Sequence, residues 1–469
     1  MQDISQTLRR IVGADNIVAN PAADHPLLID ERKLFKGKAK ALVFPKTASE
    51  LASAARVCSD AGIGMVPQGG NTGYCGGATP DASGTQIVFN LRRLNRVLDV
   101  DTRASTMTVE AGVILSDVQR AASLHDLLFP LSMGSEGSCQ IGGNLSTNAG
   151  GLAVLRYGTA KELVAGLEVV LPDGRVWSDL KGLRKDNTGY DLKQLFLGAE
   201  GTLGIITAAV LRLHPRPRTT TTAWLSLADI NRAVLVLSEL RRNLGDCLTS
   251  FEYISRESMD LVCRHVDGAQ DPLRTSQGNY ALIELVSFDA GEHLTERFEN
   301  ELGRAMRDET ISDCAVAQND SQRRAFWRLR EAIPEAEKRD GGAIKHDVSV
   351  PIGDLGGFVQ EAKQALCARF PNCRVSLFGH VGDGNVHLNV LAPSSQSSGA
   401  FHGQYADDIS TCVHTLACER NGSFSAEHGV GQLKRDLLAG TADPISMDLM
   451  KSIKQALDPQ GLMNPGKVI

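Results

Sequence analysis

Two glycine-rich stretches near the N-terminus constrain the fold of this 469-residue chain more than any other feature. They are PQGGNTGYCGG at 67–77 and PLSMGSEGSCQIGGNLSTNAGG at 130–151. Glycine adopts positive φ and lets the backbone approach a ligand closely, and successive backbone N–H groups in such loops can form anion-binding concavities. Either stretch alone could be a surface turn. Because there are two, we expect them to face each other and hold a pyrophosphate, helped by interleaved polar side chains: Asn71, Thr72, Ser135, Asn144, Ser146, Thr147 and Asn148.

The usual phosphate-binding motifs are missing from the sequence. No G-x-G-x-x-G stands between a predicted strand and a predicted helix, and no G-x-x-x-x-G-K-[ST] is present. Those patterns are typical of nicotinamide-type dinucleotide folds and of P-loop folds. Both folds are therefore disfavoured, and a different architecture must hold the phosphates.

Length and charge narrow the class of protein. A chain of 469 residues predicts two or three domains. The net charge of -6 argues against nucleic acid as a partner, since phosphate binding needs a basic surface. No apolar run is long enough for a transmembrane segment. Residues 1–16 read as a short amphipathic helix without the apolar core of a secretory signal, so we expect a cytoplasmic enzyme, or one peripheral to the inner membrane.

The ten cysteines contain no C-x-x-C pair. Cys367/Cys373 and Cys412/Cys418 share a wider spacing, but their segments look helical, and that spacing places the two thiols of each pair off one helix face. A zinc ribbon or an iron–sulfur cluster is thus disfavoured. We expect reduced and mostly buried thiols.

The first 215 residues alternate short β-type runs with helical patterns. Residues 47–62 form an expected helix, with Thr47 as its cap and Gly62 closing it, and residues 114–127 read the same way. The expected strands are 41–45, 84–91, 105–112 and 163–177, with turns between them. This region is therefore expected to be α+β.

A boundary is expected near LHPRPRT at 213–219, where two prolines and alternating cations interrupt the pattern. Beyond it, strands alternate with longer helices. We expect a strand at 279–288, helices at 291–308 and 354–370, a flexible loop at 394–400, and a C-terminal helix followed by a Pro/Gly-rich end. The domains are accordingly predicted at 1–215 and 216–425, with 426–469 as a C-terminal segment that returns to the first domain.

The stretch GHVGDGNVHLN at 379–389 suggests a metal site. The Gly382-Asp383-Gly384 segment is expected to reverse the chain, so that His380 ends one strand and His387 lies within the next. The two imidazoles can then point to one side. Asn389 would face the same side, as a hydrogen-bonding neighbour.

A third ligand is offered by SFSAEHGVG at 423–431, which contains Glu427 and His428. Alone, this pair would more often be a solvated loop pair. Two imidazoles and one carboxylate suit Zn²⁺, Mn²⁺ or Fe²⁺ with open positions for a substrate.

Five motifs in order resemble the FAD-binding domain of the vanillyl-alcohol oxidase-type flavoproteins: the two glycine-rich stretches, RYG at 156–158, LFLGAEGTLGIITAAVLRLHP at 195–215 and NPGK at 464–467. The resemblance implies an FAD-binding domain of this type, an α+β substrate-binding cap domain and a C-terminal helical segment. Some relatives attach FAD through a histidine in the first loop; this loop has none, which implies non-covalent FAD. The implied FAD-binding positions are Gly69, Gly70, Asn71, Thr72, Gly73, Gly134, Ser135, Gly142, Asn144, Asn148, Gly151, Gly201, Ile206 and Asn464.

The histidine hairpin and the later S-x-E-H-G resemble D-2-hydroxyacid dehydrogenases of the same flavin group. Carried over, the roles make His380, His387 and Glu427 metal ligands, zinc or manganese, and His428 the base. A 2-hydroxyacid must lose a hydroxyl proton and a C2 hydride. A metal lowers the hydroxyl pKa, a neutral imidazole takes the proton, and flavin N5 takes the hydride.

Substrate carboxylates need cations, and the segment 326–352 offers Arg330 and Lys345. Arg330 could instead form an exposed helix pair with Glu331. The segment resembles the substrate-binding stretch of D-2-hydroxyglutarate dehydrogenases, which makes Arg330, Lys345 and Asn389 the expected substrate-binding residues. Some members have a threonine where this chain has Pro334, so a hydroxyl contact is lost.

The first hypothesis is oxidation of D-2-hydroxyglutarate by an FAD- and metal-dependent enzyme, because two cations suit a diacid. The alternatives are a D-lactate dehydrogenase, a flavin subunit of a glycolate oxidase, a zinc hydrolase without redox chemistry, and a non-catalytic flavoprotein or partner subunit. The expected electron acceptor is an electron-transfer flavoprotein or a quinone, with an oxidase left open. The oligomeric state is also open, with a homodimer as one candidate.

Overall fold

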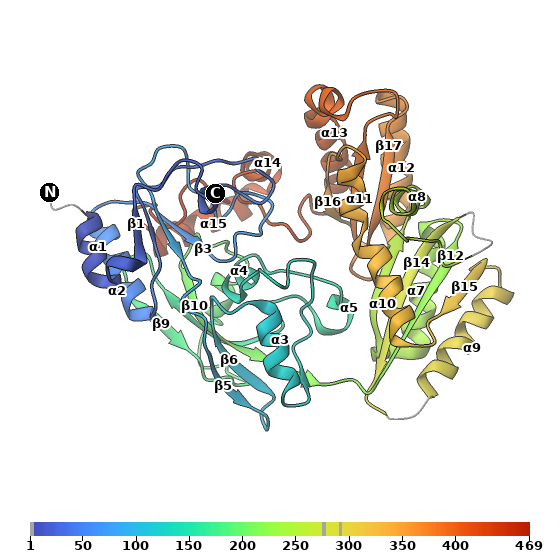
Figure 1. The fold of residues 1–469 in the computed structure, drawn as a ribbon, viewed down its shortest axis with the longest axis horizontal. Coiled ribbons are helices and arrows are strands. Elements are labelled where there is room, and N and C mark those ends of the chain that lie inside the picture. The colour runs from blue at the N-terminus through green and yellow to red at the C-terminus, as the bar shows by residue number, and fades with distance from the viewer. Residues whose placement is uncertain (1–3, 274–277, 290–292) are drawn as a thin grey trace. The chain divides into compact units, whose positions relative to one another are not determined.

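The computed structural model describes residues 4–273, 278–289 and 293–469, and the chain divides into two compact units (Figure 1). The first unit comprises Met1–Gly151, Gly158–Arg216 and Glu427–Ile469, and the second comprises Leu152–Tyr157 and Pro217–Ala426. The chain passes from one to the other between Arg216 and Pro217, inside the proline-containing stretch. Each unit mixes helices with sheets, and the α+β prediction is confirmed.

Three sheets build the first unit, in the strand orders β1-β2-β4-β3, β5-β6-β10-β8-β9 and β11-β7. In the first sheet β2, β4 and β3 are parallel, because Ala41 and Met65 both pair with Ile87. The five-stranded sheet is antiparallel. Its strand β10 is almost wholly buried, as its apolar sequence IITAAVLR predicts. The strands of this unit are β1 Ile17–Ala19, β2 Ala41–Val43, β3 Met65–Gln68, β4 Ile87–Asn90, β5 Val97–Asp101, β6 Thr106–Glu110, β7 Leu127–Leu128, β8 Val164–Val170, β9 Val176–Asp179, β10 Ile205–Arg212 and β11 His214–Pro215.

Helix ends in this unit follow the local capping chemistry. The Thr47 hydroxyl accepts from Glu50 N, and the Glu50 carboxylate accepts from Lys46 N at 2.7 Å. This reciprocal cap fixes the start of α2, and Gly62 follows its end at φ +65°. The helices are α1 Ile4–Val12, α2 Ala48–Asp60, α3 Leu115–Ser123, α4 Ile141–Ser146, α6 Lys193–Phe196, α14 Arg435–Thr441 and α15 Pro444–Leu457.

The second unit is built on one seven-stranded antiparallel sheet, in the order β15-β12-β14-β13-β17-β18-β16. The strands are β12 Thr219–Leu227, β13 Leu248–Ile254, β14 Asn279–Ser287, β15 Asp313–Val316, β16 Asp347–Ser349, β17 Arg374–His380 and β18 Asn385–Leu391. The helices are α5 Val154–Tyr157, α7 Ile230–Leu244, α8 Arg256–His265, α9 His293–Arg307, α10 Asp320–Glu331, α11 Ile333–Arg339, α12 Leu355–Arg369 and α13 Ser398–Glu419.

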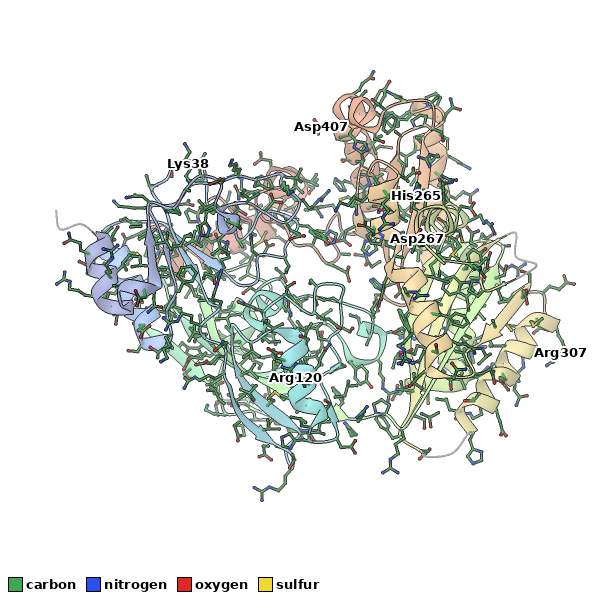
Figure 2. All side chains as sticks on the ribbon, viewed as in Figure 1. Lys38, Arg120, His265, Asp267, Arg307 and Asp407 are labelled. Atoms are coloured by element: carbon green, nitrogen blue, oxygen red, sulfur yellow. The ribbon has the colours of Figure 1, made fainter. Side chains whose placement is uncertain are left out.

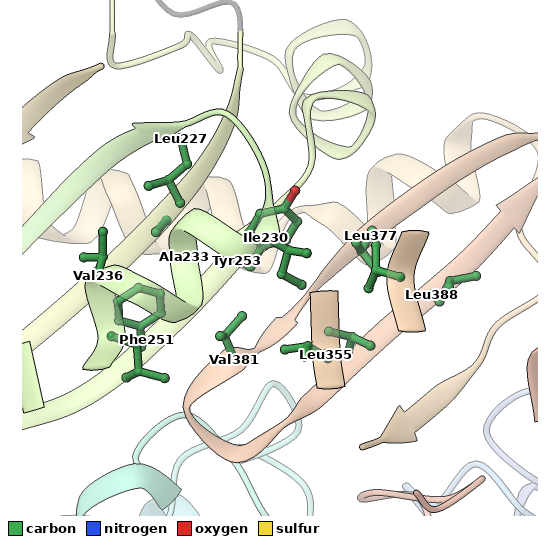
Figure 3. Close-up of a cluster of buried hydrophobic side chains, with 14 of the residues drawn as sticks. Leu227, Ile230, Ala233, Val236, Phe251, Tyr253, Leu355, Leu377, Val381 and Leu388 are labelled. Carbon is green, nitrogen blue, oxygen red and sulfur yellow. The ribbon is translucent and has the colours of Figure 1, made fainter. Parts of the chain in front are cut away.

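Helices cover both faces of this sheet. On one face, alternate side chains such as Phe251, Tyr253 and Leu377 pack against α7, α9, α12 and α13, as the close-up in Figure 3 shows for part of this core. On the other face, Trp224 and Phe378 pack against α8, α10 and α11. Because successive side chains of a strand point to opposite faces of the sheet, each strand contributes apolar side chains to two cores. This alternation also determines which polar side chains point toward α10 and α11.

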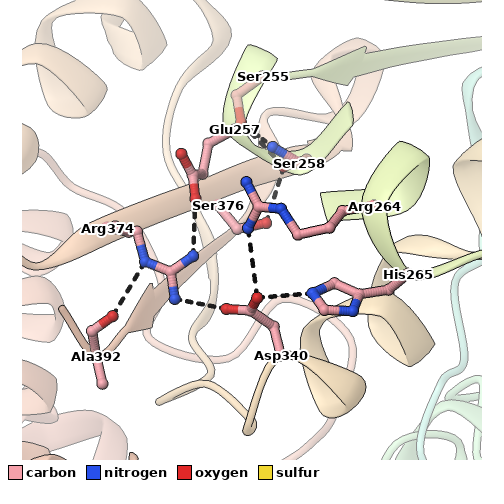
Figure 4. Close-up of polar contacts among 9 residues, drawn as sticks. All are labelled: Ser255, Glu257, Ser258, Arg264, His265, Asp340, Arg374, Ser376 and Ala392. Carbon is pink, nitrogen blue, oxygen red and sulfur yellow. Dashed lines mark hydrogen bonds and ion pairs between the residues drawn. The ribbon is translucent and has the colours of Figure 1, made fainter. Parts of the chain in front are cut away.

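A partly buried polar network ties α8 and the end of α11 to the start of β17 (Figure 4). Arg374 donates to Ala392 O at 3.1 Å, to Glu257 at 3.3 Å and to Asp340 at 2.5 Å. Asp340 also bonds His265 Nε2 at 2.7 Å. Burial alone would raise the pKa of Asp340, but these hydrogen bonds outweigh it and lower that pKa. The network fixes the strand that ends at His380.

Several sequence expectations need correction. The loop expected at 394–400 ends early, because Ser397 caps α13 and the helix begins at Ser398. Cys373 is not helical: it follows the turn after α12. All ten cysteines are free thiols, but only Cys58, Cys75, Cys139 and Cys412 are buried. Part of the helix expected at 291–308 lies outside the described residues, and α9 is described from His293.

Arg120 of α3 and Arg307 of α9 are exposed at the surface (Figure 2). In the part of the chain that the structure describes, no helix combines the length and the apolar character needed to cross a membrane.

Candidate functional site

The first unit contains a cavity between the two glycine-rich stretches, lined by residues of both. Nine of the fourteen positions expected to bind FAD line it: Gly69, Gly70, Asn71, Thr72, Gly73, Gly142, Asn144, Gly201 and Ile206. They come from the loop after β3, from α4 and from the segment before and into β10. Sequence segments far apart are thus brought to one concave surface, as the expected pyrophosphate site requires.

The cavity fits a ligand that approaches the backbone. Gly73 and Gly143 line it, and an added Cβ at either position would meet no protein atom within 4 Å. At Gly70 an added Cβ would instead lie 2.3 Å from Ser138 O, so glycine is needed there for the two loops to approach each other. The Gln140 Oε1 atom is buried and has no hydrogen-bond partner among the described residues, and Gln140 also lines the cavity. These features suit a bound dinucleotide such as FAD.

The other five positions expected to bind FAD do not line this cavity. Asn148 accepts from Thr159 Oγ1 at 2.9 Å and from Lys161 N at 3.0 Å, which fixes the chain after α4. Asn464 is buried at φ 46°, and its amide donates to Gly77 O and Glu200 O. Both side chains stabilise the walls of the cavity. The remaining three positions, Gly134, Ser135 and Gly151, lie in the loops around α4.

Sequence reasoning missed Glu200, which lines the cavity between Ala199 and Gly201. Its carboxylate accepts from Val430 N at 2.7 Å and from Gly431 N at 2.8 Å. Burial raises the pKa of Glu200, and the two backbone donors only partly offset this effect. The sequence feature that could have indicated Glu200 is an acidic residue between the glycines of GAEGTLG, at 198–204.

His428, the expected base, also lines the cavity, and its ring packs edge-on against Tyr74 with 4.9 Å between ring centroids. The candidate base therefore lies in the wall of the candidate cofactor cavity. That it acts on a substrate stays a prediction.

The second unit gathers a polar cluster on the sheet face that α10 and α11 cover. Four adjacent strands contribute one residue each: Glu252 from β13, His380 from β17, His387 from β18 and Asp347 from β16. Glu252 pairs directly with His380, and Asp347 pairs directly with His387. Directly paired residues project to the same face of a sheet. The hairpin expected around Gly382-Asp383-Gly384 thus carries the two histidines as the sequence predicts, with Val381–Asp383 as a single 3₁₀ turn.

His380 is oriented by a carboxylate that the sequence did not reveal. Its Nδ1 atom lies 2.5 Å from Glu252 Oε1, and the imidazole is buried. Burial would raise the pKa of Glu252, but His380 and Arg330 outweigh it and lower that pKa to about 2. An ionised carboxylate only accepts, so Nδ1 carries a proton and Nε2 is the ring nitrogen left to bind a metal. Carboxylate–histidine pairs of this kind accompany metal-binding imidazoles.

Glu427 completes a set of metal-ligating groups. The chain before it is held on β16, because Ser423 and Ser349 form a bridge and Ala426 N donates to Asp347 O at 3.3 Å. Among the described residues, His380, His387 and Glu427 each offer one ligand atom, and these atoms lie within 4.8 Å of one another. Two imidazoles and a carboxylate could hold a divalent transition metal.

Arg330 is buried beside this group and is not the exposed partner of Glu331. Its Nε donates to Glu252 Oε2 at 2.8 Å, and its guanidinium lies over the Phe378 ring, 4.6 Å from the centroid. Its Nη1 and Nη2 groups make no hydrogen bond to the residues that the structure describes. They remain available to a carboxylate ligand.

Lys345 and Asn389 meet at a second buried acid, Glu337 of α11. The Asn389 amide nitrogen lies 3.0 Å from both carboxylate oxygens, and Lys345 Nζ lies 3.6 Å from Oε2. Burial raises the pKa of Glu337. Pro334 occupies the first turn of α11, where a missing N–H costs nothing. Helix α11 therefore accommodates Pro334, which stands where some D-2-hydroxyglutarate dehydrogenases have a threonine.

Two family models match the chain. One, described as the FAD binding domain, matches residues 39–179, and the other, described as the C-terminal domain of FAD linked oxidases, matches residues 216–468. Together they span both units.

Curated relatives match along the full length. A mitochondrial D-2-hydroxyglutarate dehydrogenase from Arabidopsis thaliana is 36% identical over 468 residues, covering 100% of this chain and 81% of the relative. The Bos taurus protein of the same name is 37% identical, covering 100% and 84%. A putative mitochondrial D-lactate dehydrogenase from Schizosaccharomyces pombe is 34% identical, covering 100% and 90%. The word mitochondrial in these names gives no support to the cytoplasmic location expected from the sequence.

Solved structures share the fold. An alkyldihydroxyacetonephosphate synthase superposes with a TM-score of 0.75 at 17% identity, covering 98% of this chain and 84% of that chain. A p-cresol methylhydroxylase does so with a TM-score of 0.75 at 16% identity, covering 99% and 96%. The vanillyl-alcohol oxidase-type architecture expected from the five motifs is confirmed.

Proposed function

Because the chain belongs to the FAD-linked D-2-hydroxyacid dehydrogenases of the vanillyl-alcohol oxidase-type flavoproteins, we propose that it oxidises D-2-hydroxyglutarate to 2-oxoglutarate. The proposed reaction depends on non-covalent FAD and on a divalent metal, zinc or manganese. It removes the hydroxyl proton and transfers the C2 hydride to flavin N5. The observation that carries this proposal is the grouping of His380, His387 and Glu427 beside the buried Arg330.

The proposed metal site rests on the donor set and on its support. His380 presents Nε2 because Glu252 binds its other ring nitrogen. A bound divalent ion would supply the Lewis acidity that lowers the pKa of a coordinated hydroxyl group. His380, His387 and Glu427 would hold it.

The proposed base is His428. A neutral imidazole accepts the hydroxyl proton at neutral pH. Bound FAD would supply the two-electron acceptor that side chains lack. The glycine loops at 67–77 and 130–151 would hold its pyrophosphate through backbone N–H groups.

The proposed substrate is a dicarboxylate, since the site offers two cations. Arg330 keeps its two Nη groups for one carboxylate, and Lys345 is a third exposed, with a long 3.6 Å contact to Glu337. Each cation is partly neutralised by a buried acid, so the preference for a diacid over a monoacid is modest. D-lactate is the second candidate, favoured by the relative named a putative D-lactate dehydrogenase and by the hydroxyl missing at Pro334.

The test is a substrate panel of D-2-hydroxyglutarate, D-lactate and glycolate with an artificial electron acceptor. It is run on the purified protein, on metal-stripped protein, and after zinc or manganese is restored. We expect D-2-hydroxyglutarate to give the highest kcat/KM, and metal removal to abolish turnover reversibly. A protein that oxidises D-lactate but not D-2-hydroxyglutarate would move the assignment to the second candidate. The same assay with a purified electron-transfer flavoprotein or a quinone tests the two expected acceptors.

A further inference from the structure

We propose that Glu200 is a positioning residue that fixes the segment carrying His428 to the wall of the cofactor cavity. The kinetic part of this inference rests on the proposed function, in which His428 is the base. The structural part does not, because it concerns contacts within the first unit.

The backbone of Glu200 is held in a conformation that glutamate seldom adopts. Its φ is 50°, in the left-handed region that favours glycine. Its N–H donates to Ser146 O at 2.8 Å, and its carbonyl accepts from Asn464 Nδ2 at 2.8 Å. Ser146 belongs to α4, which also lines the cavity. A strained residue retained at a cavity points to a role that its side chain fulfils.

The side chain of Glu200 joins this wall to the segment after His428. Its two carboxylate oxygens accept from Val430 N at 2.7 Å and from Gly431 N at 2.8 Å. These amides lie two and three residues beyond His428. Both hydrogen bonds use a carboxylate as acceptor and are partly buried, which makes them stronger than neutral ones.

The surroundings leave the carboxylate little freedom. An added Cβ at Gly429 would lie 2.7 Å from Glu200 Oε1, and one at Gly77 would lie 3.2 Å from Oε2. Glycine at both positions therefore lets the carboxylate approach the segment. Further along, Gln432 Nε2 donates to Gly76 O and Thr79 O, so the first glycine-rich loop holds the distal part of the same segment.

The test is the isosteric variant Glu200→Gln in the full-length holoprotein. An amide retains one acceptor oxygen and presents NH₂ to the other backbone N–H, so one hydrogen bond is lost without a change of volume. The matched control is Glu110→Gln. Glu110 is 5% exposed in the same unit and also accepts a backbone N–H, that of Arg96 at 2.8 Å, besides its ion pair with the Arg96 guanidinium, but it does not line the cavity.

Hydrogen exchange measured by mass spectrometry on a peptide covering residues 429–433 reports how well the backbone amides of this segment are protected. The measurement needs no enzymatic turnover. We expect the amides of Val430 and Gly431 to exchange about tenfold faster in Glu200→Gln, the factor that loss of one charge-assisted hydrogen bond produces, and at the wild-type rate in Glu110→Gln. FAD content, read from flavin absorbance, should stay unchanged in both variants. Unchanged exchange in Glu200→Gln, or loss of FAD with unchanged exchange, would overturn the inference.

Steady-state kinetics then separate positioning from folding. We expect Glu200→Gln to lower kcat about tenfold with the KM for D-2-hydroxyglutarate unchanged, because a displaced base slows proton removal without weakening substrate binding. A wild-type kcat in Glu200→Gln contradicts the positioning role. If the wild-type protein oxidises no substrate in the panel, the proposed function fails, and the exchange result alone decides the structural part.

A second variant, Gly77→Ala, tests the inference independently if the Glu200→Gln protein does not fold. Gly77→Ala keeps the charge of Glu200 and shifts its carboxylate by a few tenths of an ångström, because the new Cβ contacts Oε2. It should change exchange and kcat in the same direction as Glu200→Gln, but less. An effect on neither quantity contradicts the inference.

Discussion

Replacing Glu252 with glutamine removes the charge that joins His380 to Arg330 without changing the volume of the side chain. The wild-type carboxylate accepts from His380 Nδ1 at 2.5 Å and from Arg330 Nε at 2.8 Å, and it is 1% exposed. A glutamine amide has one acceptor oxygen and one NH₂ group. If its oxygen stays with Arg330, the NH₂ group faces Nδ1, the imidazole proton moves to Nε2, and Nε2 can no longer bind a metal. If its oxygen stays with His380, the NH₂ group faces a buried guanidinium.

The expected loss follows from these contacts. Removing the hydrogen-bond partner of a metal-binding histidine lowers metal affinity by about 10- to 100-fold, which is about 1.4–2.8 kcal/mol at about 1.4 kcal/mol per factor of ten. The buried Arg330 also loses its counter-charge. Breaking a buried ion pair costs about 3–5 kcal/mol of folding free energy, and the retained amide oxygen should keep the loss at the lower end.

The assay is zinc titration of metal-stripped protein against a chromophoric chelator, with denaturant unfolding followed by circular dichroism. Glu337→Gln is the matched control, because Glu337 is 0% exposed in the same unit but binds Asn389 and Lys345 instead of an imidazole. We expect zinc affinity to fall in Glu252→Gln and to stay near the wild-type value in Glu337→Gln. Equal affinity in the wild type and in a folded Glu252→Gln would refute the view that this carboxylate orients His380.

Three further predictions concern the base, the core and the pH dependence of stability. His428→Ala should retain FAD and zinc but lower kcat by about 10²–10⁴-fold; loss of flavin absorbance would instead assign His428 to cavity structure. Phe298→Ala, in the fully buried face of α9, should lose about 3–5 kcal/mol in denaturant unfolding, and a loss below 1 kcal/mol would contradict the packing described. Lys467 is 1% exposed, and burial lowers its pKa from 10.5 to about 8. The unfolded chain then binds more protons between these values, so wild-type stability relative to Lys467→Met should rise by about 2–3 kcal/mol between pH 7 and pH 10. A pH-independent difference between the two unfolding free energies would show that Lys467 is solvated.

The sequence predicted elements whose signals are local. Thr47 begins its helix as expected, because capping depends on neighbours within four residues. The Gly-Asp-Gly segment identified the histidine hairpin, since a tight reversal has its own residue chemistry. The wrong loop prediction at residues 394–400 also concerns a local signal. Serine is common both in loops and at helix caps, and Ser397 is the cap of α13.

The sequence did not predict the acids that support the site. Glu252 lies 128 residues before His380 in an apolar strand with no motif around it. Its partner is determined by the strand order β13-β17, which no local pattern reveals. Glu337 lies on the short charged helix α11 with no motif around it, and its burial follows from tertiary packing. Identifying either residue required the sheet topology.

The way the sheet assembles the proposed metal site has a consequence for how the protein matures. His380 and His387 lie on one hairpin, but Glu252 and Asp347 join them through strand pairs that are distant along the chain, so closure of long loops must precede the meeting of all four. A fragment of the second unit must reach from Glu252 to His387 to contain all four positions. A nascent or partly refolded chain should therefore be unable to capture the ion, and ion capture should mark the moment at which β13 docks onto the hairpin.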